Sequence, residues 1–89
     1  MSIYLLDGKD MTSKEEAFRV IAKEMAFPEH FGKNLDALYD CLSEKPSDTV
    51  VHFVNTAILN EFLGDYGEKI LRCFRDAAGE CRFTLREKR

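Results

Sequence analysis

Two aspartates four residues apart, Asp36 and Asp40, are the side chains of this sequence best placed to do chemistry together. Residues at this spacing lie on one face of a helix. The leucines at positions 35, 38 and 42 predict that helix and place its buried stripe on another face. Both carboxylates are therefore expected to point into solvent, where they could contact a cationic partner, hold a metal or act in acid–base catalysis.

Helix stability alone explains the two aspartates to different degrees. Asp36 lies in the first turn, where a negative charge suits the helix dipole. Asp40 lies towards the negative end of the helix, is a weak helix former and is repelled by Asp36. A position that accepts several local penalties hints at a functional reason. Asp40 is therefore the stronger candidate.

Catalysis or metal binding by this pair would need groups that the pattern does not supply. A chain of 89 residues can hardly build a substrate cleft. His30 and Asp76 could complete a metal site, but no recognised spacing links them to the aspartates. Cys41 and His30 leave a thiol–imidazole dyad open, but nothing in the pattern favours it over core packing, which is the usual role of such a cysteine. We expect no catalytic residue, metal or cofactor.

Composition narrows the kind of partner. The net charge is -3 and the sequence pI is about 5.3, which is unfavourable for nucleic-acid binding because phosphate contacts need clustered Lys and Arg. An acidic chain suits a basic protein partner, since complementary charge speeds encounter. No apolar segment approaches the roughly 18 residues of a membrane span. The odd number of cysteines, without a CxxC pair or a secretory signal, predicts reduced thiols in the cytoplasm.

Apolar periodicity predicts helices that alternate with strands. The expected strands are a buried run at 3–6, a β-branched and aromatic run at 49–54, and a third at 81–85. The expected helices cover 14–25, 35–43, 58–63 and 66–78, and a charged tail follows at 86–89. Parallel neighbours need such crossovers, so the pattern favours a small parallel sheet with helices packed against it.

Several residues mark where the helices begin. Ser13 and Glu16 form a capping box for the first helix. Asn34 is a good N-cap for the second helix, after a loop in which Gly32 is free to take a positive φ. Asn55 is expected to cap the third helix.

Other residues mark the helix ends. Pro28 should end the first helix near Met25 or Ala26. Gly64 is expected to end the third helix and Gly79 the fourth.

The segment from Phe27 to Leu42, which reads FPEHFGKNLDALYDCL, closely resembles the signature of the barstar family. That signature is a hydrophobe-Pro-Glu, an aromatic pair, Gly-x-Asn-Leu-Asp-Ala-Leu, an aromatic and Asp-Cys-Leu. The later FRDA stretch at 74–77 resembles the family's Phe-Arg-acid-Ala. The resemblance covers essentially the whole chain and is weakest from Glu44 to about Gly67.

The resemblance implies an α/β fold with a three-stranded parallel sheet and about four helices, as one domain of residues 1–89. It implies an intracellular inhibitor of a barnase-like, guanyl-specific type of ribonuclease, monomeric when free and bound to a basic extracellular-type nuclease 1:1. One alternative is an immunity or regulatory protein of the same fold with a different toxin or nuclease as its target. Another is a small hydrolase that uses Asp36, Asp40 and His30.

The resemblance also implies roles for individual residues. Asp40 would enter the nuclease pocket in place of an RNA phosphate, and Asp36 would contact basic residues beside it. Asp76 matches a family Glu that makes a further ion pair. The other expected contacts, from the loop, the helix start and an aromatic position, are His30, Gly32, Asn34, Leu35 and Tyr39.

Three of these residues depart from the family pattern. Asp76 is one methylene shorter than Glu, and Tyr39 replaces a tryptophan. His30 replaces a tyrosine and adds a group that titrates near neutral pH. These departures leave the identity of the target open.

Overall fold

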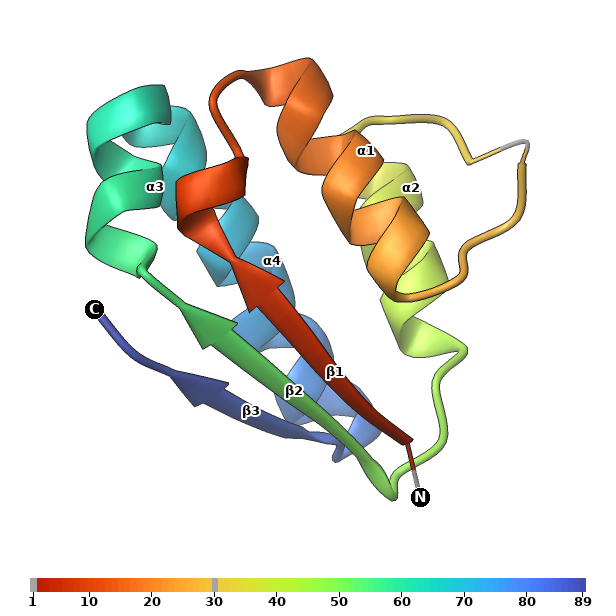
Figure 1. Ribbon diagram of the computed structural model, residues 1–89. Coiled ribbons are helices and arrows are strands. Elements are labelled where there is room, and N and C mark those ends of the chain that lie inside the picture. Colours follow the sequence, from red (N-terminus) through yellow and green to blue (C-terminus); the bar gives the residue numbers. More distant parts are fainter. Residues whose placement is uncertain (1, 30) are drawn as a thin grey trace.

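Three parallel strands in the order β1-β2-β3 form the sheet (Figure 1). The computed structural model describes residues 2–29 and 31–89. The strands are β1 (Ser2–Asp7), β2 (Thr49–Val54) and β3 (Thr84–Glu87). The helices are the one-turn 3-10 helix η1 (Gly8–Asp10), α1 (Lys14–Glu24), α2 (Leu35–Ser43), α3 (Thr56–Leu63) and α4 (Asp65–Cys81). The predicted parallel sheet with about four helices is confirmed.

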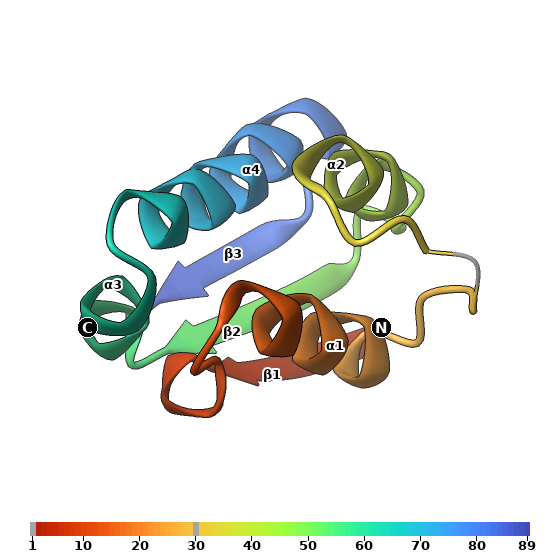
Figure 2. The ribbon, with the colours of Figure 1, turned by 90° about the horizontal axis from the view of Figure 1, so that it is seen from above.

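The helices α1 and α4 pack on the same face of the sheet, and α2 lies on that side against α4 (Figures 1 and 2). Helix α3 lies at one end against α4 and η1. Between the sheet and these helices, the buried apolar side chains of the described residues form a cluster, which includes Phe18, Leu38, Phe53 and Phe74. Burial of this kind supplies most of the favourable free energy of folding. The position of α2 is thus set by a core that it shares with α4.

The opposite face of the sheet carries no helix among the described residues (Figure 2). Along β2, Thr49, Val51 and Phe53 are buried and alternate with half-buried residues. In β1, Leu6 is buried, but Ile3 is 63% and Leu5 60% exposed. The prediction that the first strand is buried is therefore wrong for one face, because helices cover only the other.

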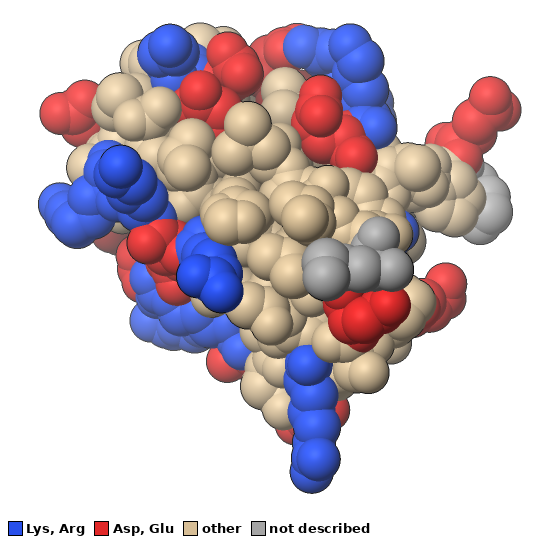
Figure 3. All heavy atoms as spheres, turned by 60° about the horizontal axis from the view of Figure 1, so that its bottom comes forward, with Lys and Arg blue, Asp and Glu red and all other residues tan. Residues whose placement is uncertain are grey.

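Figure 3 turns the bottom of Figure 1 forward and shows how charge is distributed there. Uncharged side chains fill the middle of this view, and Lys, Arg, Asp and Glu gather around them.

The predicted ends of α4 and β3 were misplaced. Gly79 does not stop α4, which continues to Cys81 and ends with Arg82 in a left-handed conformation at φ 62°. A glycine costs a helix interior only about 1 kcal/mol, and packing of this long helix outweighs that cost. Strand β3 consequently begins at Thr84, and it includes Glu87, which was predicted to lie in the tail.

The N-cap predicted at Ser13 is confirmed, but the Glu16 carboxylate of the predicted capping box accepts hydrogen bonds from Arg19. The Ser13 hydroxyl accepts from the Glu16 amide at 3.1 Å.

The helix start at Asn55 differs from prediction. Asn55 makes no side-chain cap and adopts φ 55°. Its side-chain Nδ2 instead donates to the Asp7 carboxylate at 2.7 Å. This bond holds the pKa of Asp7 below its usual range. Asn55 thus joins the ends of β1 and β2, and α3 begins at Thr56, earlier than predicted.

The helix ends agree with prediction more closely. Glu24 is the last residue of α1, with Met25 as its C-cap. Gly64 ends α3 at φ 58°, a conformation in which glycine carries no steric penalty.

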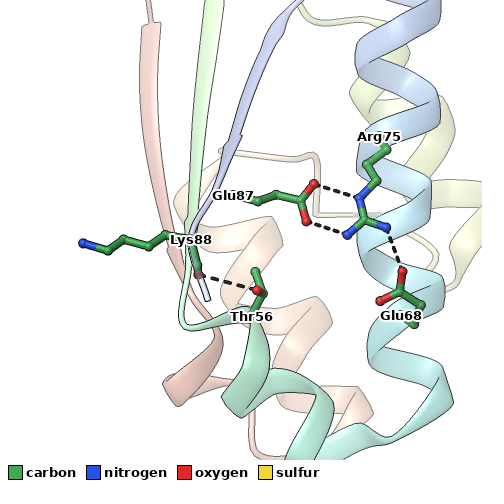
Figure 4. A network of polar contacts seen from close by, with 5 residues as sticks. All are labelled: Thr56, Glu68, Arg75, Glu87 and Lys88. Carbon is green, nitrogen blue, oxygen red and sulfur yellow. Dashed lines mark hydrogen bonds and ion pairs between the residues drawn. The ribbon is translucent and has the colours of Figure 1, made fainter.

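Arg75 of α4 fastens β3 to the helical layer (Figure 4). Its guanidinium donates two 2.7 Å bonds to the Glu87 carboxylate and a third, also of 2.7 Å, to Glu68. The two carboxylates raise the pKa of Arg75, and Arg75 in turn lowers the pKa of Glu68. Beside this cluster, the Lys88 carbonyl accepts from the Thr56 amide at 3.2 Å. The end of β3 is therefore tied to both α3 and α4.

Arg75→Gln is expected to lower the free energy of unfolding by about 1 kcal/mol at pH 7. Bidentate pairs contribute some of the largest stabilisation energies found for exposed ion pairs. The folded pKa of Glu68 is depressed, so its contribution is present above the unfolded value of about 4.3 and is lost as the pH falls through the folded value. Urea unfolding at pH 7 and pH 3 measures both effects.

The matched control is Arg19→Gln, which removes an exposed pair with Glu16 inside one helix. Its expected effect is smaller than that of Arg75→Gln, because solvent screens an exposed pair. If Arg75→Gln lowered the free energy of unfolding as much at pH 3 as at pH 7, the ion-pair explanation would be contradicted.

Candidate protein-binding site

The loop before α2 is held by the side chain of Asn34. Its Oδ1 accepts from the Ala37 amide at 2.8 Å, as predicted for an N-cap, and its Nδ2 donates to the Gly32 carbonyl at 3.0 Å. The positive φ predicted for Gly32 is instead at Lys33, with φ 49°. A Cβ on Gly32 would lie 3.3 Å from both Ala37 and Asn34. Glycine at this position therefore serves close packing of the turn on the helix.

Helix α2 packs against α4 through its apolar stripe and through two thiols. Leu38 and Leu42 are fully buried. The Cys73 thiol donates to the Leu35 carbonyl and the Cys81 thiol to the Ser43 carbonyl, both at 3.6 Å. Each bond spans 38 residues, so the two helices run in the same direction in a constant register.

An acidic row runs along the exposed side of α2. Asp36, Asp40 and Glu44 follow one another at intervals of four residues, and all three are exposed. Glu44 is the C-cap of the helix, whose last turn contains no basic residue. Acids near this end oppose the helix dipole. Sequence reasoning missed Glu44, although its spacing from Asp40 repeats that of Asp40 from Asp36.

A hollow of about 280 Å³ lies between α2 and α4; we call it the α2–α4 hollow. It brings together four residues predicted from sequence and three that were not. The predicted residues are Leu35, Asp36, Tyr39 and Asp76, and the others are Lys69, Arg72 and Cys73. Lys69, Arg72 and Asp76 are three and four residues apart, so helical spacing could have grouped them.

Asp40 lines a different hollow, of about 450 Å³, between α2 and the loop before it; we call it the α2–loop hollow. Its lining is Pro28, Phe31, Gly32, Ala37, Asp40, Cys41 and Glu44. The two aspartates thus share one helix but face different hollows. Asn34 is exposed beside them at the helix start. His30 lies outside the described residues.

Burial and neighbouring acids raise the pKa values of a thiol beside each hollow. Burial raises the pKa of Cys73 to about 11, and Asp76 and Asp36 add to the rise. Burial, followed by Glu44 and Asp40, raises the pKa of Cys41. Burial also raises the pKa of Tyr39. Both thiols remain protonated near neutral pH, which is unsuitable for a nucleophile.

Metal binding and membrane insertion find no support in the part of the chain that the structure describes. No group of three or more His, Cys, Asp or Glu side chains there could hold a metal ion. No helix in residues 2–29 and 31–89 is long and apolar enough to cross a membrane. What the described residues do present is a row of exposed acids on a capped helix of a small α/β fold, which suits contact with a basic protein.

Comparison with known proteins identifies the family of this chain. The family model described as "Barstar (barnase inhibitor)" matches residues 1–89. A Bacillus subtilis protein named "Putative ribonuclease inhibitor YrdF" is 33% identical over 79 residues, which cover 85% of each chain. The chain belongs to the barstar family, whose members are inhibitors and not enzymes. The family resemblance and the absence of an activity of its own, both predicted from sequence, are confirmed.

Removing the acids from the second half of α2 is expected to leave the fold intact. Asp40→Asn and Glu44→Gln each relieve repulsion within the acidic row and at the helix C-terminus, so each should raise the free energy of unfolding by up to about 0.5 kcal/mol. Asn34→Ala is the contrasting variant, because loss of the cap should cost about 1 kcal/mol. Urea unfolding at pH 7 compares the three. A loss above 1 kcal/mol in Asp40→Asn would indicate a structural role for this carboxylate.

Proposed function

We propose that residues 1–89 act as a single domain that inhibits a barnase-like, guanyl-specific type of ribonuclease by placing Asp40 in its phosphate pocket. The observation that carries this proposal is the position of Asp40. It is exposed on a helix that is capped at one end and packed on α4, and it forms no ion pair with another described residue. Its charge is therefore free for a partner.

The chemistry of a ribonuclease pocket suits such a carboxylate. The pocket must hold preorganised cations to stabilise the phosphate charge. A carboxylate on a rigid helix can occupy the same position without being cleaved. Pairs between Arg and carboxylate can be bidentate, and they strengthen when water is excluded. The acidic row would also speed encounter with a basic nuclease.

The neighbouring residues extend this contact. Asp36 and Asp76, in the α2–α4 hollow, would meet basic groups beside the pocket, and Leu35 and Tyr39 would supply apolar surface. The remaining proposed contacts, at the start of α2 and in the loop before it, are His30, Gly32 and Asn34. His30 is the candidate for pH-dependent binding, because histidine titrates near neutral pH.

The proposed complex is 1:1 and cytoplasmic. The inhibitor would be monomeric until it binds a nuclease of the basic, extracellular type. The three cysteines are free and half-buried, as expected in a reducing compartment.

Asp40→Ala is expected to weaken nuclease binding by about 100-fold or more, because removal of one partner from a desolvated charge pair costs about 3 kcal/mol. Calorimetry with barnase-type ribonucleases, alongside inhibition of RNA cleavage, measures this effect. Asp10→Ala is the control, since Asp10 is an exposed acid of η1 that lines neither hollow. Unchanged affinity in Asp40→Ala would place the inhibitory surface elsewhere.

The alternative of an immunity or regulatory protein with a different target would use the same surface. The two cations in the α2–α4 hollow favour keeping this alternative, because they do not suit a uniformly basic partner. Inhibition assays against a panel of ribonucleases and deoxyribonucleases separate the two.

The hydrolase alternative is tested by incubating the purified chain with RNA and phosphoester substrates. We expect no turnover. Turnover that Asp40→Asn abolishes would contradict a purely inhibitory function.

A further inference from the structure

Lys69 and Arg72 line the α2–α4 hollow together with Asp36 and Asp76. Both are exposed on α4, and neither forms an ion pair with another described residue. Arg75, on the same helix, is by contrast held by two carboxylates. Arg75 is therefore engaged in ion pairs within the folded protein, whereas the charged groups of Lys69 and Arg72 are available to bind a partner.

The two hollows beside α2 differ in charge. Among the residues that the structure describes, the α2–loop hollow is lined by two acids, Asp40 and Glu44, and by no Lys or Arg. The α2–α4 hollow is lined by two acids and two cations. A partner that covers both hollows meets acids without a cation among the described lining residues around Asp40, and acids together with two cations around Lys69.

This arrangement imposes a condition on the partner. A cationic phosphate pocket complements the region around Asp40, but a basic rim that continues over Lys69 and Arg72 would be repelled. Juxtaposed like charges suppress wrong partners, and opposite charges fix the register of an interface. Arg72 could bind a carboxylate of the partner through its planar fork, and Lys69 as a point charge.

We propose that Lys69 and Arg72 are specificity residues, which select a nuclease that presents a carboxylate beside its cationic pocket. This inference rests on the proposed inhibition of a ribonuclease and adds a chemical requirement on the target. A nuclease whose rim is basic at this position is bound weakly, even when its pocket accepts Asp40.

A purely structural role for the two cations makes a different prediction. If they only balanced Asp36 and Asp76, their neutralisation would lower the free energy of unfolding and would change affinity for every nuclease alike. A specificity role requires that affinity depend on the charge of the nuclease rim.

The experiment uses barnase and a set of barnase variants, each with one glutamate added at the rim of the active site. Affinities are measured by calorimetry at low ionic strength for the unmodified chain and for the double variant Lys69→Gln/Arg72→Gln. We expect at least one rim glutamate to tighten binding to the unmodified chain tenfold or more. The double variant should lose that gain and bind unmodified barnase more tightly than the natural chain does.

The matched control is Lys9→Gln/Lys23→Gln, which removes two exposed lysines that line neither hollow and should preserve the gain. A double variant that changes affinity for all probes by the same factor, within twofold, would overturn the specificity role. Asp40→Ala is measured with the same probes. If Asp40→Ala binds as tightly as the unmodified chain, the proposed function fails independently of the specificity role. If the unmodified chain binds no probe, both proposals fail.

Discussion

The packing of α2 on α4 determines how the acids of α2 and the charges of α4 lie relative to one another in the proposed binding site. Leu38 and Leu42 enter the same buried cluster as Phe74 and Ala77, and two thiol bonds maintain one register along the helix pair. Since interiors are close-packed, a shift of either helix would disturb the whole core. The acids of α2 and the charges of α4 therefore keep fixed relative positions, which reduces the entropy lost when a partner binds.

The acidic row lowers the stability of α2, and the buried core more than offsets this loss. Three acids on one short helix repel one another, and the last of them faces the negative end of the helix dipole. Each cost is a fraction of a kcal/mol, whereas each buried leucine contributes about 2 kcal/mol. The fold can therefore carry an unpaired acidic surface. Natural proteins often depart from stability optima at functional sites in this way.

Local patterns predicted much of the secondary structure. The β-branched run at 49–54 and the capped leucine stripe of α2 were predicted to the residue, because their signals lie within the segments themselves. The predicted end of α4 was wrong. Gly79 ends a helix only where tertiary packing does not stabilise further helical turns. Asn55 was assigned a local cap, but its partner is Asp7, far away in the sequence.

The sequence by itself determined the spacing of Asp36 and Asp40, the cap at Asn34 and membership of the barstar family. These depend on neighbouring residues or on a contiguous motif. Only the tertiary structure decided that the two aspartates face different hollows, that Lys69 and Arg72 lie beside Asp36, and that one face of β1 is exposed. Each of these depends on how elements distant in the chain pack around a shared core. Periodicity shows which side of an element is buried, but not which other element packs against it.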